Sequence, residues 1–77
     1  MKLYLLFQTD NLDYGNYDSC IVAAESEDKA RLISPSGKFG GTFISGWANS
    51  PETVEVSLVG TAKRGTKPGV ILSKLLD

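Results

Sequence analysis

The sequence contains no histidine and only one cysteine, Cys20. The absence of histidine removes the side chain that most often acts as a general base and as a metal ligand. A lone cysteine cannot form an internal disulfide or a zinc site, and an unpaired thiol is typical of a reducing cytoplasm. Without histidine, neither Cys20 nor any serine has its usual activating partner. We therefore expect no enzymatic activity, no cofactor and no metal, with Cys20 as a small buried residue.

Long apolar runs and a strong net charge are absent as well. No stretch approaches the roughly 20 apolar residues of a membrane span. The apolar run at residues 3–7 is also shorter than that of a signal peptide. The formal net charge of −1 gives no reason to expect binding to free nucleic acid or to a membrane. We expect a cytoplasmic protein.

The composition is that of a folded domain, with 42% hydrophobic and 22% charged residues. The 77 residues are enough for one domain, residues 1–77. Four segments have hydrophobic patterns typical of strands, and they are residues 2–8, 18–25, 53–60 and 69–76. The first two are expected to form a broad hairpin. In the third, Val54, Val56 and Leu58 alternate with polar residues and should share the buried face.

The first and last of these segments are apolar on both faces, which predicts that they lie at the centre of the sheet. Residues 42–48 are a candidate for a short fifth strand, with a bulge at Gly46. The polar residues 61–68 are expected to form a turn between the last two strands.

A short helix is predicted from Glu27 to about Ile33. Ser26 is a favourable N-cap, and the acidic first turn suits the helix dipole. The helix should end before Pro35. The expected fold is therefore α+β: an antiparallel sheet of four to five strands, with one short helix on one face, in the order β-β-α-β-β.

One short helix cannot cover such a sheet, so some apolar surface should remain. Candidates for this surface are Tyr4, Leu6, Ile71 and the loop at residues 39–47. We expect this surface either to mediate homodimerisation or to meet a partner.

The first candidate site is the acidic loop with Asp10, Asp13 and Asp18. The spacing does not fit a calcium loop. Either these residues form a solvated turn, or they meet a basic partner surface. The glycine-rich segment at residues 37–42 follows a helix and lacks the spacing of a phosphate-binding loop.

The second candidate site is the basic segment with Lys63, Arg64 and Lys67. Cations and turn amides can hold an anion, although a basic surface turn is the simpler interpretation. Aromatic residues Phe43 and Trp47 lie in the glycine-rich middle of the chain. Trp47 either anchors a protein interface, stacks on a base, or covers the core.

Several segments resemble small bacteriophage proteins, and these are residues 1–6, 17–27, 58–62 and 68–73. The arrangement of a strand followed by Ala24-Glu25-Ser26-Glu27 and a helix is similar to that of small anti-CRISPR-like proteins. The resemblance implies a non-enzymatic accessory protein that acts in the cytoplasm of the infected bacterium and blocks a host defence component.

Three functions follow as hypotheses. In the first, the chain binds and blocks a host defence protein or nucleoprotein complex through five residues: Asp10, Asp13, Asp18, Phe43 and Trp47. In the second, it is a sponge that sequesters a nucleotide immune signal through four residues: Trp47, Lys63, Arg64 and Lys67. In the third, it is a homodimeric structural or regulatory phage protein.

Overall fold

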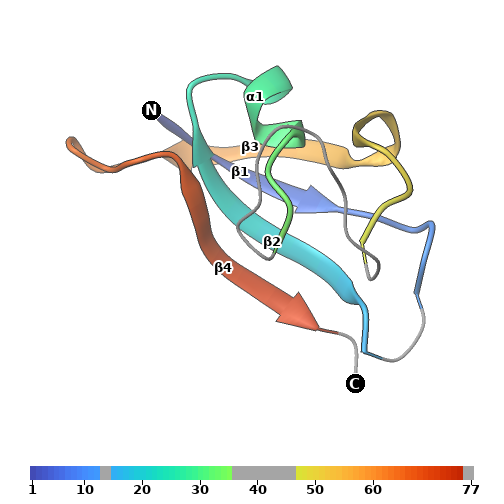
Figure 1. Cartoon of the computed structure of the whole chain (residues 1–77). Coiled ribbons are helices and arrows are strands. Elements are labelled where there is room, and N and C mark those ends of the chain that lie inside the picture. Colours follow the sequence, from blue (N-terminus) through green and yellow to red (C-terminus); the bar gives the residue numbers. More distant parts are fainter. Residues whose placement is uncertain (13–14, 36–46, 76–77) are drawn as a thin grey trace.

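The computed structural model describes residues 1–12, 15–35 and 47–75, with side chains described as far as residue 72. These residues form a four-stranded antiparallel sheet, one short α-helix and one 3₁₀ turn (Figure 1). The elements are β1 (Lys2–Phe7), β2 (Tyr17–Ala24), α1 (Glu27–Arg31), η1 (Pro51–Thr53), β3 (Glu55–Thr61) and β4 (Gly69–Leu75). The predicted α+β class is confirmed. Most of the candidate fifth strand lies outside the described residues.

The strand order in the sheet is β3-β1-β2-β4. The predicted hairpin is confirmed, because β1 and β2 pair antiparallel from Lys2 opposite Ala24 to Phe7 opposite Ser19. The prediction that the last strand lies at the centre is wrong, because β4 forms an edge. Its residues Ile71 and Leu72 are more than half exposed. The apolar pattern of β4 therefore reflects an uncovered surface and not burial on both faces.

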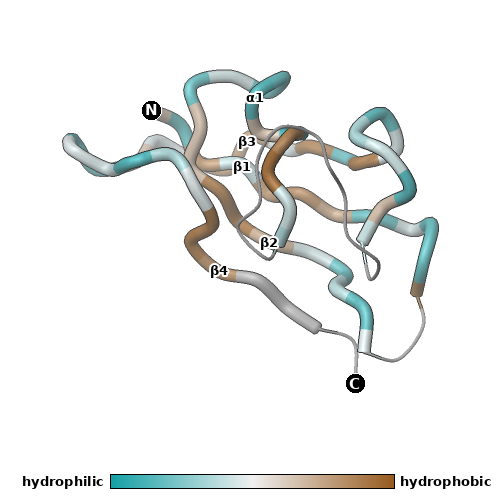
Figure 2. The backbone as a smooth tube through the Cα atoms, in the orientation of Figure 1, coloured by the Kyte–Doolittle hydropathy of each residue, from teal (hydrophilic) through white to brown (hydrophobic). Residues whose placement is uncertain are grey.

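Strands β3 and β4 lie at opposite edges, so the connection at residues 62–68 is not a hairpin turn as predicted. It crosses the end of the sheet that holds the start of β1 (Figure 1). The backbone amide of Ala62 donates to the carbonyl oxygen of Met1 at 3.0 Å, which fixes the start of this crossing. Figure 2 shows that hydrophobic residues concentrate in the strands, whereas this connection is largely hydrophilic.

The core lies between the sheet and α1. On the sheet side its residues are Tyr4, Leu6, Cys20, Val22 and Ala24. On the other side they are Ala30, Ile33, Trp47, Ala48 and Val54. Tyr4 and Leu6 had been candidates for leftover surface, and this expectation is wrong because α1 and the segment around Trp47 cover their face of β1.

The helix begins as predicted, with the Ser26 hydroxyl oxygen accepting a hydrogen bond from the backbone amide of Lys29 at 3.2 Å. It ends at Arg31, earlier than the predicted Ile33. A five-residue helix is not stable alone. Two features help to hold it: Ala30 is fully buried, and the Arg31 guanidinium donates to the backbone carbonyl of Val54, the residue just before β3.

The buried face of the third strand is shorter than predicted. Val54 is buried and Val56 is partly buried, but Leu58 is 60% exposed. The register between β1 and β3 shifts between Leu3 and Tyr4, so that Leu58 pairs with Tyr4 and Gly60 with Leu3. Leu58 therefore points to the helix side of the sheet, at an edge that α1 does not cover.

Leu6→Ala should destabilise the protein by about 2–5 kcal/mol, because the Leu6 side chain is completely buried and its removal leaves a cavity in the core. That is a large share of the roughly 4–12 kcal/mol expected for a domain of this size. Urea unfolding, monitored by circular dichroism, measures this loss of stability. The control Leu58→Ala removes an exposed leucine on the neighbouring strand and should shift the midpoint far less. Equal midpoints for the two variants would contradict this account of the core.

Candidate functional site

A network of polar side chains lies where the chain leaves β1, and we call it the polar corner: Gln8, Asp10, Asn11, Asn49 and Thr53. At its base, the Gln8 side chain is 2% exposed. Its Nε2 donates to the carbonyl oxygens of Asn11 at 2.7 Å and Tyr17 at 2.8 Å. Its Oε1 accepts from the Asn11 amide at 2.8 Å. Both the nitrogen and the oxygen of the buried amide therefore have hydrogen-bond partners, as burial of a polar group requires.

The upper part of the polar corner joins this loop to a distant segment. Asn11 Nδ2 donates to the Trp47 carbonyl oxygen at 2.7 Å and to Asn49 Oδ1 at 3.0 Å. Asp10 Oδ2 accepts from the Asn49 amide at 3.0 Å and also from the Thr53 hydroxyl. These bonds hold the loop after β1 against η1, although neither segment is a regular strand or long helix.

The carboxylates of this region are exposed, but they accept hydrogen bonds from neighbouring groups. The Thr53 hydroxyl, followed by the Asn49 amide, lowers the pKa of Asp10 below its ordinary value. The backbone amide of Glu52 and the Ser50 hydroxyl lower the pKa of Glu52. The Ser19 hydroxyl donates to Asp18 Oδ1 at 2.9 Å. Asp10 thus has a structural role in addition to any contact with a partner. The third predicted acid, Asp13, lies outside the described residues.

Next to the polar corner, Leu12 leaves 55% of its surface exposed. Leu12 follows Asn11 of the polar corner in the chain and Glu52 precedes Thr53, so the exposed residues at this end include both an apolar and a charged side chain. Protein interfaces combine the same two components, an apolar centre and a polar rim. Sequence patterns did not reveal the roles of Gln8, Asn11 and Asn49, because each depends on contacts between distant segments.

Trp47 is a core residue, with 1% of its surface exposed. Among the described residues, its indole Nε1 has no hydrogen-bond partner. This placement agrees with the interpretation that Trp47 covers the core, and its ring is not presented to solvent for stacking. The other predicted aromatic, Phe43, lies outside the described residues.

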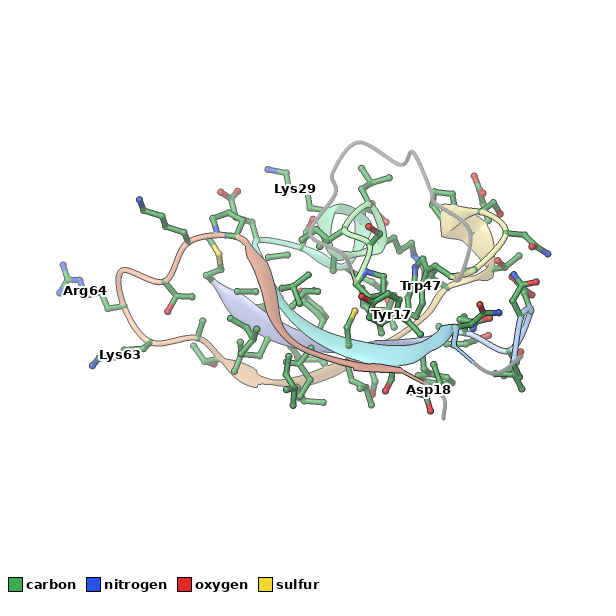
Figure 3. All side chains as sticks on the ribbon, turned by 60° about the horizontal axis from the view of Figure 1, so that its bottom comes forward. Tyr17, Asp18, Lys29, Trp47, Lys63 and Arg64 are labelled. Carbon is green, nitrogen blue, oxygen red and sulfur yellow. The ribbon has the colours of Figure 1, made fainter. Side chains whose placement is uncertain are left out.

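The basic segment forms an exposed turn. The Lys63 carbonyl oxygen accepts from the Thr66 amide at 3.0 Å and from its hydroxyl at 2.6 Å. Gly65 has a positive φ of 91°, which suits the third position of a type II turn. Lys63 and Arg64 lie at the opposite end of the molecule from Trp47 (Figure 3). The structure therefore does not bring together the residues proposed to hold a nucleotide; Lys67 is exposed in the same connection.

The face of the sheet opposite α1 carries a group of apolar side chains from β1, β2 and β4, and we call this face the open face. On β3 the same face holds Glu55 and Ser57. Leu5 pairs with Ile21, which pairs with Leu72, and paired residues share a face. Alternation along β1 adds Leu3 and Phe7. In Figure 3 side chains stand on this side of the sheet, whereas α1 and Trp47 lie on the other. None of the described elements covers it. The sequence predicted uncovered apolar surface, but at Tyr4 and Leu6 on the other face of β1, because no sequence pattern records which face the helix covers.

The described residues contain no cluster of three or more potential metal ligands. None of the helices in this part of the chain is long and apolar enough to cross a membrane. Comparisons with models of protein families, with curated proteins and with solved structures found no match. The candidate functional surfaces are therefore those given by the geometry: the polar corner, the basic turn and the open face.

Cys20 should be unreactive in the folded protein. It is 2% exposed, and burial raises the pKa of its thiol to about 12. At pH 8 it should therefore react slowly with a thiol-specific chromogenic disulfide, and rapidly in concentrated urea, where a thiol has a pKa of about 8.5. A prompt reaction without denaturant would contradict the burial of Cys20.

The Asp10 contacts predict a loss of stability in acid. A carboxyl whose pKa is lowered by folding stabilises the protein above its unfolded-state pKa, and this contribution is lost as the pH falls through the lower folded-state value. Asp10→Asn should therefore reduce stability at pH 7 and flatten the decline of stability below about pH 4. Thermal unfolding between pH 2 and 7 measures both effects.

Thr53→Val is the companion variant, because it removes the hydroxyl that lowers the Asp10 pKa most. In this variant, the carboxyl carbon resonance of Asp10 should titrate at a higher pH than in the wild type. An unchanged titration would show that the hydrogen bond does not act on Asp10 in solution.

Proposed function

We propose that the chain is a non-enzymatic binding protein that inhibits a bacterial defence system by contacting a defence protein or nucleoprotein complex. The observation that carries this proposal is the construction of the polar corner. Its hydrogen bonds hold Asp10 and Asn49 in place, and the exposed residues Leu12 and Glu52 are next in sequence to Asn11 and Thr53 of this network. A contact surface that is already ordered loses less conformational freedom on binding than a flexible loop.

The chemistry of the partner follows from this surface. Asp10, Asp18 and Glu52 at this end favour a basic partner surface, and Leu12 favours an apolar depression within it. Lys and Arg side chains that ordinarily bind nucleic acid would supply such a basic surface on a defence complex. The resemblance to small phage and anti-CRISPR-like proteins supports the same class of target and a location in the infected bacterial cytoplasm.

Sequestration of a nucleotide is the weaker alternative. It required the cations of the basic turn and Trp47 to meet in one pocket, but they lie at opposite ends of the molecule (Figure 3). Trp47 is buried as well. Protein contact requires no such pocket, and we therefore prefer it.

The test is phage plating on bacteria that carry single defence systems and express the protein. The wild type should restore plaque formation against at least one system by several orders of magnitude. Leu12→Ser and Glu52→Lys alter exposed side chains of the proposed surface and should each reduce this rescue at least ten-fold. Their expression and thermal stability should match those of the wild type.

Leu32→Ser is the matched control. Leu32 is also an exposed leucine, at 40%, but it lies at the end of α1. This variant should inhibit as well as the wild type. If no defence system is inhibited, the anti-defence function is wrong. If a system is inhibited and all three variants act equally, the function stands but the surface formed by Leu12 and Glu52 next to the polar corner is not its contact surface.

A further inference from the structure

The open face is a surface that the proposed function does not use. The polar corner includes Thr53 of η1, and η1 lies on the same side of the sheet as α1 (Figure 3). On the open face, Phe7 is 38% exposed and Leu72 63%, with Leu3, Leu5 and Ile21 partly exposed between them. Contiguous apolar surface of this kind is unusual on a protein that has no interaction there.

We propose that the open face binds the open face of a second copy of this chain, forming a two-fold symmetric dimer with two stacked sheets. Each strand of one sheet runs opposite to the same strand of the other sheet. The two-fold axis therefore lies midway between the sheets and is perpendicular to the strands. This inference goes beyond the proposed function and does not depend on it.

The distribution of charge selects this arrangement. Glu55 pairs with Phe7 at the far end of β1, and it therefore shares the open face at that end of the sheet. The basic turn follows Thr61, which pairs with Lys2 at the opposite end. Figure 3 shows Lys63 and Arg64 at one end of the molecule and Asp18 at the other. Each sheet therefore has one basic and one acidic end.

Opposite strand directions place the basic end of each copy over the acidic end of its partner. Lys63 and Arg64 of one copy then face Glu55 of the other, and symmetry forms the same contact twice. If the strands ran in the same direction, the basic turns of the two copies would meet, which is unfavourable. A second copy thus satisfies both the apolar face and the charged ends.

The size of the face predicts a weak dimer. Four strands about 4.8 Å apart and six residues long at about 3.3 Å each give a projected area of roughly 400 Å². Stable interfaces bury about 800 Å² of accessible surface on each partner. Because accessible area exceeds projected area, the open face and the charged ends together reach the lower end of this class. We expect dissociation in the micromolar range.

Sedimentation velocity over a series of protein concentrations is the first test. The mass should rise from the 8.3 kDa of one chain to twice that value as concentration increases. Leu72→Lys should raise the dissociation constant about a hundred-fold, because each dimer would bury two charges on the open face. Circular dichroism at low concentration should show an unchanged monomer, since Leu72 is largely exposed in a single chain.

Leu58→Lys is the control, because Leu58 has a similar exposed fraction, 60% against 63%, but points to the helix side at the other edge. It should dimerise like the wild type. The charge variants test the direction of the strands. At low salt, Glu55→Lys and Lys63→Glu should each weaken the dimer about ten-fold. The double variant should restore dimer affinity. Because the two residues lie at opposite ends of one sheet, the restored contact must join residues of different copies.

Three results would overturn the proposal. One is a chain that stays monomeric at several hundred micromolar. Another is a dimer that survives Leu72→Lys, since it would join the copies by strand edges or another surface. The third is a charge-reversed double variant as weak as the single variants, since the basic turn and Glu55 would then not meet.

Discussion

The structure depends on the shortage of helix relative to sheet. In the described part of the chain, one helix of five residues and a 3₁₀ turn must cover a four-stranded sheet. They cover only one face, and they do so with the help of Trp47 and Ile33, which fill space that a longer helix would occupy. Among the side chains that the structure describes, all strongly buried apolar ones except Ala23 belong to this layer. The opposite face remains apolar and uncovered as a direct consequence.

The polar corner supplies hydrogen bonds to segments that lie outside regular helix and sheet. The segments after β1 and before β3 have few regular hydrogen bonds of their own, so side chains must satisfy their backbone groups. Gln8 and Asn11 do this with amide groups, which can donate and accept at once. Through the Trp47 carbonyl, the same network is joined to the core. Packing and surface shape at this end of the molecule are therefore coupled.

Features determined by neighbouring residues were predictable from the sequence. The Ser26 cap, the β1–β2 hairpin and the α+β class follow from local patterns. Strand order was not predictable, because apolar residues on both faces of β4 fit either a central strand or an edge strand with an uncovered face. The candidate sites failed to converge for a related reason. Whether Lys63 approaches Trp47 depends on the crossing of the chain, which no local pattern records.

The crossing at residues 62–68 also shapes how the protein folds. Of the three strand pairs in the described sheet, only β1–β2 joins strands that follow one another in the chain. Strand β3 finds its place by pairing Glu55 with Phe7, and β4 by pairing Leu72 with Ile21, each across a long stretch of sequence. Closing such loops costs entropy before any contact forms, which slows folding. The β1–β2 hairpin is thus the natural template for the rest of the sheet. On the newly made chain, the backbone groups at its two edges stay unpaired until β3 pairs with β1 and β4 pairs with β2.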